Sequence, residues 1–305
     1  MIFEGNPQVM KILTEKKSLM EAGLPHAHIK PLLIIDGGLM KGAYSVGAVM
    51  ALEELGYSDV FSNIVGISSG APTAAYFVAK EVEKGTRIFW QECSSRKFIN
   101  MWRVWNQVNT FYFSAVLRGV SGKGLTTQNV LESKTALHIG VADFKTGAPK
   151  LLYPQTGEDL LKAIQASILM PNVSNDIVKF DDIRYVDGGF TRPHIIRTAI
   201  DSIEATHVLI MTNQDKVVST IPWLERFLNQ TIFRLRMPPA LRFAAHERRR
   251  ERMKALEYMS ANFAKPYALV WGDHSISSME RDARVVRAVT EKSRQWWKMQ
   301  LTNKQ

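Results

Sequence analysis

Cysteine and long hydrophobic runs are scarce in this sequence of 305 residues. The one cysteine, Cys93, excludes an internal disulfide bond and suits a reducing compartment. We expect its thiol to be a small buried group and not a nucleophile. No apolar run is long enough to span a bilayer, and residues 1–20 lack the apolar core of a signal peptide. These absences favour a cytoplasmic protein that is soluble or at most peripherally attached to a membrane.

Acidic residues are also in short supply. The chain has 39 Lys and Arg against 29 Asp and Glu, which gives a formal net charge of +10. Such a surplus favours anionic partners, among them phosphate head groups, acidic lipid surfaces, acyl carriers and nucleic acid, without choosing between them. A hydrophobic content of 46% is ample for a substantial core.

Strand and helix patterns alternate along the chain. Short apolar runs, typical of buried strands, occupy residues 32–35, 137–142, 150–153, 177–180, 184–186, 205–212 and 267–271. Helical patterns occupy residues 43–55, 158–169, 221–233 and 240–263, and one more runs from about Met279. Residues 1–30 form a helical or irregular lead-in. The alternation predicts an α/β protein with a mainly parallel sheet.

Gly66-Ile67-Ser68-Ser69-Gly70 fits the Gly-x-Ser-x-Gly pattern of a nucleophile elbow. An apolar run precedes it and an Ala-rich helical pattern follows it, which predicts a strand, a tight turn and a helix. In such a turn the hydroxyl of Ser68 is exposed from a strained backbone, and amides at the helix start favour an oxyanion there. The motif alone is equally compatible with a turn that only serves packing.

A glycine turn, Asp36-Gly37-Gly38, ends the apolar run 32–35. It is not a dinucleotide-binding fingerprint, because its next glycine, Gly42, comes too late. It is not a Walker A loop either, because Lys41 precedes that glycine instead of following it. Two alternatives remain: a tight turn without chemistry, or an oxyanion hole. The hole would take its amides and positive charge from Gly37, Gly38, Leu39 and Lys41.

A second acidic turn follows the predicted strand 184–186, where Asp187 precedes Gly188 and Gly189. An acidic residue at this point lies where open α/β sheets place their sites. Asp-Gly pairs also form ordinary turns, so this motif gains meaning only from Ser68 upstream.

The three motifs, in this order on an α/β scaffold, resemble those of the patatin-like phospholipases, bacterial acyl hydrolases included. The family pattern is Asp/Glu-Gly-Gly-Gly-x-Arg/Lys-Gly, then Gly-x-Ser-x-Gly, then Asp-Gly-Gly/Ala. Ala166-Ser167 and Pro171 also resemble the approach to the family's aspartate strand. The resemblance implies a three-layer αβα catalytic domain at residues 31–213. Residues 214–305 would then be a mostly helical extension packed on that domain.

The resemblance also implies a chemistry. Ser68 would be the nucleophile and Asp187 its general base, a dyad that uses no histidine, metal or cofactor. The substrate would be a phospholipid or lysophospholipid ester, with peripheral contact to an anionic membrane; nucleic acid is not an expected partner. The remaining motif residues would be Asp36, Gly42, Gly66, Gly70, Gly188 and Gly189.

Two points stay open in this interpretation. Leu39 stands where the family has a third consecutive glycine, and a leucine at positive φ would be strained by roughly 1–3 kcal/mol. The alternative to a dyad is a Ser-Asp-His hydrolase with His274 as the third member, or less plausibly His194 or His207. The stretch from Ser278 to Asp282 resembles a tail of bacterial patatin-like proteins, which explains that region without catalysis.

Three further segments carry alternatives. An aromatic stretch predicts helices and loops, either as core or as an acyl-chain pocket or lipid-facing surface. It contains Trp90, Trp102, Trp105, Phe111, Tyr112 and Phe113. Residues 234–254 are rich in arginine and predict a solvated helix, with Glu247–Arg250 and Glu251–Lys254 pairs, or a surface for anionic lipid. A third alternative is a surface for nucleic acid, and with either surface the chain could be a binding protein with weak catalysis. Trp296 and Trp297 would pack on the core or act as an apolar anchor.

Overall fold

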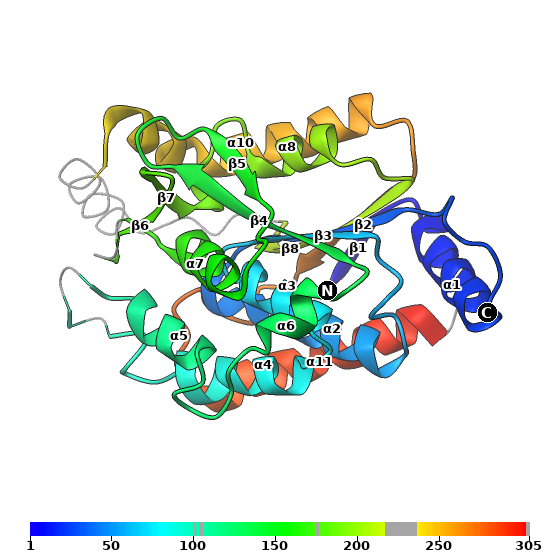
Figure 1. Cartoon of the computed structure of the whole chain (residues 1–305), viewed down its shortest axis with the longest axis horizontal. Helices are drawn as coiled ribbons and strands as arrows, with labels where there is room; N and C mark the ends of the chain where they lie inside the picture. The colour runs from blue at the N-terminus through cyan, green and yellow to red at the C-terminus, as the bar shows by residue number, and fades with distance from the viewer. Residues whose placement is uncertain (101, 104–105, 172, 175–176, 217–236, 303–305) are drawn as a thin grey trace.

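Among the residues that the structure describes, nine strands form one sheet (Figure 1). The computed structural model describes residues 1–100, 102–103, 106–171, 173–174, 177–216 and 237–302. Across the sheet the order is β1-β9-β8-β2-β3-β4-β7-β6, with β5 paired to β4. In chain order the strands are β1 (Ile2–Gly5), β2 (Pro31–Ile35), β3 (Asn63–Ile67), β4 (Ala136–Asp143), β5 (Pro149–Leu152), β6 (Val178–Phe180), β7 (Ile183–Asp187), β8 (His207–Asp215) and β9 (Tyr267–Gly272).

The centre of the sheet is parallel. Strands β9, β8, β2, β3 and β4 pair in parallel, and every residue of β2 is buried, as its continuous apolar run predicts. Among the described strands, antiparallel pairing lies toward the edges, between β1 and β9, β4 and β5, β4 and β7, and β6 and β7. The predicted α/β class with a mainly parallel sheet is therefore confirmed.

Helices cover both faces of the sheet, and each face has its own apolar core. Alternate side chains of strand β2 therefore lie in two different cores. Leu33 and Ile35 pack on one side, in the core shared with the helices drawn below the sheet in Figure 1. Leu32 and Ile34 pack on the other, against α8 and α10. The helices are α1 (Gln8–Glu21), α2 (Ala43–Glu54), α3 (Gly70–Val78), α4 (Val82–Ile88), α5 (Thr110–Leu117), α6 (Thr127–Leu131), α7 (Gly157–Ile168), α8 (Ile195–Ser202), α10 (Pro239–Asn262) and α11 (Ala283–Thr302), with short turns η1 (Leu39–Gly42), η2 (Phe89–Cys93) and η3 (Gly188–Phe190).

Most predicted elements occur within a few residues of their predicted bounds. Helix α2 ends before Gly56, which has a φ of +78° and acts as the stop that the sequence indicates. The last helix begins at Ala283, four residues after the predicted start at Met279. The helix predicted at residues 221–233 lies outside the described residues.

The two ends of the chain contribute to the central sheet. Strand β1, from the predicted lead-in, pairs antiparallel with β9, from the predicted C-terminal extension. Strand β9 in turn pairs in parallel with β8. The domain boundaries at residues 31 and 214 stay predictions, but both flanking segments supply strands to the sheet that carries the motifs.

Burial decides two of the open alternatives. Trp297 is fully buried and α11 packs on α2, so the tryptophan is part of the core and the apolar-anchor hypothesis is wrong for it. Cys93 is buried too, as predicted.

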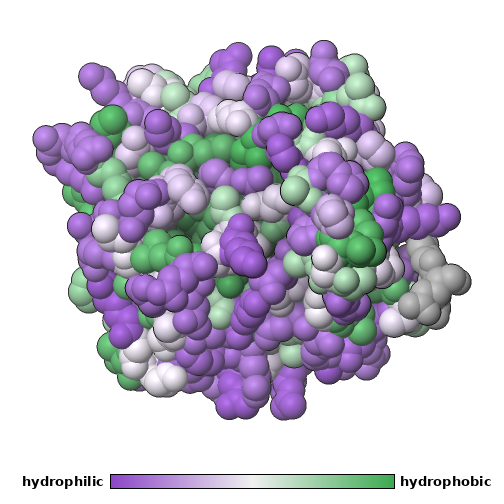
Figure 2. Space-filling view, turned by 45° about the vertical axis from the view of Figure 1, so that its right-hand side comes forward, coloured by the Kyte–Doolittle hydropathy of each residue, from purple (hydrophilic) through white to green (hydrophobic). Residues whose placement is uncertain are grey.

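No helix in the described part of the chain is long and apolar enough to cross a membrane. Figure 2 shows a face on which hydrophilic side chains predominate and hydrophobic ones gather in hollows between them.

Candidate active site

Ser68 lies in the tight turn between β3 and α3 with a φ of +55°. This left-handed conformation is uncommon for a residue other than glycine and is the strained geometry expected of a nucleophile elbow. The flanking glycine at position 70 is required by space, because a Cβ there would lie 2.1 Å from the carbonyl oxygen of Ile35. The tight turn therefore depends on the spacing of the motif and not only on its serine.

The Ser68 hydroxyl donates a hydrogen bond to Asp187, with 2.6 Å between Oγ and Oδ2. Asp187 is the last residue of β7, and its other carboxylate oxygen accepts the amide of Gly189 at 2.7 Å. Both side chains are buried; Ser68 is only 6% exposed, so the prediction of an exposed hydroxyl is wrong. Burial raises the pKa of Asp187 to about 6, against the lowering effects of the Ser68 hydroxyl and the Gly189 amide. The two residues predicted from separate motifs thus meet in one hydrogen bond.

Ser167, at the end of α7, fixes the backbone of the elbow. Its hydroxyl accepts the amide of Ser68 at 2.9 Å and donates to the carbonyl of Gly140 at 2.7 Å. The side chain therefore ties the nucleophile to β4, the strand that pairs with β7 and Asp187. These two hydrogen bonds explain the serine of the Ala166-Ser167 pair in the sequence motif.

The turn after β2 brings Gly37 against the nucleophile. A Cβ at Gly37 would lie 2.5 Å from the Cβ of Ser68, so any larger residue would displace the serine. The Gly37 amide donates to the carboxylate of Asp36 at 2.7 Å. The amides of Gly38, Leu39 and Ser69 have no hydrogen-bond partner among the described residues. These three donors are available to an oxyanion, whereas that of Gly37 is already in use.

Leu39 has a φ of +52°, the left-handed conformation that favours glycine. A glycine, which the family pattern has at this position, would adopt this conformation without strain. The leucine side chain is partly buried against the main core, which offsets some of the backbone strain.

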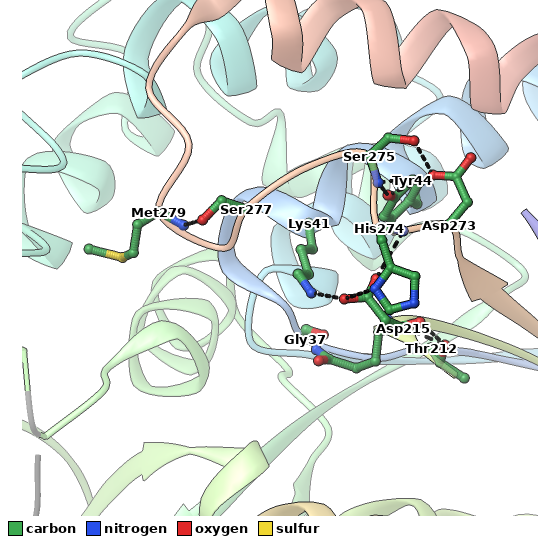
Figure 3. A network of polar contacts seen from close by, with 11 residues as sticks. Gly37, Lys41, Tyr44, Thr212, Asp215, Asp273, His274, Ser275, Ser277 and Met279 are labelled. Carbon is green, nitrogen blue, oxygen red and sulfur yellow. Dashed lines mark hydrogen bonds and ion pairs between the residues drawn. The ribbon is translucent and has the colours of Figure 1, made fainter. Parts of the chain in front are cut away.

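Lys41 has an acidic partner. Its ammonium forms an ion pair with Asp215 at the end of β8, and Figure 3 shows the side chain pointing to that carboxylate. The positive charge of Lys41 is therefore shared with Asp215, and its role in the oxyanion hole stays a prediction.

Among the described residues, none of the three candidate histidines forms a hydrogen bond or ion pair with Ser68 or Asp187. His274 pairs with Asp215 at 3.0 Å (Figure 3), and His194 accepts the amide of Ile196 at the start of α8. His207 contacts the hydroxyl of Thr206. The described residues also contain no group of three His, Cys, Asp or Glu side chains that could hold a metal ion.

The arginines of α10 face two ways. Arg249 and Arg250 are exposed, and the predicted pairs Glu247–Arg250 and Glu251–Lys254 are both present. Arg252 is instead buried, with Nε 2.7 Å from Oδ2 of Asp36. The hypothesis that these arginines form one lipid-docking surface is therefore wrong for Arg252; the earlier residues Arg234 and Arg236 lie outside the described residues.

The aromatic stretch is likewise divided. Phe113 is buried and Trp102 is 91% exposed, while Phe111 is 70% exposed. Trp105 lies outside the described residues. The predicted helices and loops are present as α4, η2, α5 and α6. A narrow apolar cavity lies beside the elbow helix, and its lining includes Pro72, Tyr76, Phe89 and Phe113.

Two positioning side chains at the end of β8 were not predicted. Asn213, with a φ of +50°, donates to the carbonyl of Asp36 at 2.7 Å and to Ser45 Oγ. Gln214 donates to the carbonyl of Gly37 at 2.7 Å. Both residues follow a buried apolar run, at the same carboxyl edge of the sheet as Asp36, and that position is the signal that could have indicated them.

The family model for patatin-like phospholipases matches residues 33–200, which is more than half of the chain. The chain belongs to the patatin-like phospholipase family. Its three family motifs are those that converge on Ser68 in the structure.

Individual relatives of this patatin-like chain are distant. An uncharacterized protein of Escherichia coli, YjjU, is 20% identical over 198 residues, which is 64% of this chain and 55% of that protein. The solved structure of VipD from Legionella pneumophila is 12% identical with a TM-score of 0.49, and the match covers 88% of this chain and 66% of VipD. The type III effector ExoU, known from Pseudomonas aeruginosa, is 14% identical with a TM-score of 0.35, over 90% and 53% of the two chains. The chain thus spans between about half and two thirds of the length of these proteins.

Proposed function

We propose that this chain is a serine acyl hydrolase that cleaves carboxylic esters of lipids with Ser68 as nucleophile and Asp187 as general base. The observation that carries the proposal is the 2.6 Å hydrogen bond from the Ser68 hydroxyl to the buried Asp187 carboxylate. Membership of the patatin-like family supports a lipid substrate.

The reaction begins with attack of Ser68 Oγ on the ester carbonyl carbon, while Oδ2 of Asp187 takes the hydroxyl proton. The amides of Gly38, Leu39 and Ser69 stabilise the negative charge that develops on the carbonyl oxygen. The protonated Asp187 then gives its proton to the leaving alcohol, and an acyl-enzyme remains.

Water completes the cycle. Asp187 takes a proton from a water molecule that attacks the acyl carbon, and the proton returns to Ser68 as the acid leaves. A carboxyl with a pKa of about 6 suits both steps, because it is ionised at neutral pH and still binds a proton in the transition state.

The substrate proposed is a glycerophospholipid or lysophospholipid, which makes the chain a phospholipase A or lysophospholipase. The positive net charge of +10 supports peripheral contact with an anionic membrane. The proposed setting is cytoplasmic, which suits a chain with a single cysteine.

The test is hydrolysis of lysophosphatidylcholine, phosphatidylglycerol and a short soluble ester by the wild type, Ser68→Ala and Ser69→Ala. Activity of the wild type that is lost in Ser68→Ala and kept in Ser69→Ala supports the proposal. Activity that persists in Ser68→Ala rejects the nucleophile. Ser68-dependent hydrolysis of the soluble ester alone would support the serine nucleophile and reject the phospholipid substrate.

A further inference from the structure

We propose that two arginines of α10, Arg252 and Arg248, are positioning residues of the active site, and that they balance the charge of its two buried carboxylates, Asp36 and Asp187. The inference rests on the proposed function, because it concerns how Asp187 is kept available as a base. It assigns a catalytic purpose to a helix that lies outside the family match at residues 33–200.

Arg252 acts through Asp36. Its Nε lies 2.7 Å from Oδ2 of a carboxylate that is completely buried, in an ion pair whose N–H is not aligned for a hydrogen bond. The other oxygen of Asp36 accepts the amide of Gly37, the residue against which Ser68 packs. A chain of contacts thus leads from α10 to the nucleophile through the first turn.

Arg248 lies one helical turn before Arg252, on the same face of α10. Its Cδ would be 3.7 Å from a Cβ at Gly189, and its guanidinium lies 5.4 Å from the centre of the Phe190 ring. Arg248 forms no ion pair with a described carboxylate within 4.0 Å, yet its charge acts on both Asp187 and Asp36. It therefore lies over the second turn as Arg252 lies over the first.

The charges around the dyad explain why two cations are needed. Burial raises the pKa of Asp187 most, and the charge of Asp36, which is also buried, raises it further. The Ser68 hydroxyl, the Gly189 amide and the charge of Arg248 lower that pKa. From α8, His194 faces the two arginines, and burial and their charges lower its pKa well below the usual value, so it adds no further cation. Loss of either arginine would leave the carboxylates less compensated.

The experiment measures the pH dependence of kcat/KM for a short soluble ester, and of the rate of fluorophosphonate labelling, in matched variants. Arg248→Gln removes a positive charge near Asp187, and Arg252→Gln leaves Asp36 without its counter-ion beside Asp187. Each variant should therefore raise the midpoint of the acid side of the pH profile by about one pH unit. Arg252→Lys keeps the charge and should retain the wild-type midpoint. Arg249→Gln and Arg250→Gln, exposed on the same helix, should not move it.

The double variant Asp36→Asn/Arg252→Gln removes both members of the buried pair. Its midpoint should fall below that of Arg252→Gln, since the repulsion between the carboxylates is gone. If Arg252→Gln does not fold, the pH midpoints of Arg248→Gln and of this double variant test the inference.

An unchanged midpoint in folded Arg248→Gln and Arg252→Gln, with activity lowered equally at every pH, overturns the inference and leaves the arginines a purely structural role. A wild type without labelling that depends on Ser68 is a different result: it rejects the proposed function, and the inference with it. Labelling that depends on Ser68 together with an unmoved acid limb rejects the inference alone.

Discussion

The chain contains two Asp-Gly-Gly turns, each at the carboxyl end of a strand, and they have opposite electrostatic surroundings. In both, the aspartate accepts the amide of a glycine in its own turn at 2.7 Å. Asp36 places its second oxygen against the guanidinium of Arg252, whereas Asp187 places its second oxygen against the neutral hydroxyl of Ser68. The same three residues thus give a carboxylate in direct contact with a guanidinium in one turn and a carboxylate with a more distant cation, Arg248, in the other.

The difference teaches what makes a carboxylate reactive in this fold. Asp36 has the guanidinium of Arg252 2.7 Å from its Oδ2 as a direct counter-ion. Asp187 has a more distant cation, Arg248, and burial raises its pKa to about 6. The first turn therefore serves as a fixed support and the second as a base that can exchange a proton.

Removal of the base should have the largest effect. Asp187→Asn keeps the shape of the turn but cannot accept the Ser68 proton, and we expect kcat to fall by about 10²–10⁴-fold. Steady-state hydrolysis of a soluble ester measures this. His274→Ala is the matched control and should be nearly silent, because His274 pairs with Asp215; the reverse pattern would favour a Ser-Asp-His triad.

Removal of the Asp36 carboxylate from the first turn should instead lower the stability of the fold. Asp36→Asn leaves the buried Arg252 without its counter-ion, and we expect the free energy of unfolding to fall by about 3–5 kcal/mol in urea titrations. Asp187→Asn should leave that free energy unchanged or raise it at pH 7. The folded pKa of Asp187 lies above its ordinary value, so the stability it contributes is present at low pH and is lost as the pH rises through 6. Equal destabilisation by the two variants would contradict the comparison.

The pH dependence of the wild type follows from the second turn. Asp187 must be ionised to act as base, so activity should fall on the acid side with a midpoint near pH 6. At pH 5 we expect kcat/KM to be about tenfold below its plateau. A midpoint near pH 4, the ordinary range of an aspartate, would show that the second carboxylate is compensated as fully as the first.

The smallest effect should come from Leu39→Gly in the first turn. Glycine relieves the strain of a φ of +52°, but it loses packing and gains freedom in the unfolded chain, so the free energy of unfolding should change by less than about 1 kcal/mol. We expect a modest rise in kcat because the amides near the nucleophile become less crowded. Unchanged kinetics would show that Leu39 leaves them accessible.

Local patterns in the sequence were sufficient to predict the central strands and both members of the proposed dyad. Strand β2 is a continuous apolar run, and Ser68 is flanked by glycines whose spacing the turn requires. Strand β1 was missed, because four residues carry little periodicity and their pairing with β9 joins segments more than 260 residues apart. Such pairing depends on tertiary contacts that no local window contains.

The inward arginines were missed for a different reason. Residues 234–254 were interpreted by composition, and a charge count does not tell which side of a helix faces the core. A signal was present: Arg248 and Arg252 continue a helical stripe whose other members are the buried residues Leu241, Ala244, Ala255, Leu256 and Met259. Two cations within an apolar stripe imply buried acidic partners, which here are the two aspartates of the turns.

The most direct test of the account is to map the residue that a fluorophosphonate modifies, by tandem mass spectrometry of the labelled wild type, Asp187→Asn and Asp36→Asn. The account predicts label on Ser68 in the wild type, labelling slowed by at least about 10²-fold in Asp187→Asn, and a much smaller change in folded Asp36→Asn. Label on Ser69, or equal rates in the wild type and Asp187→Asn, would contradict it.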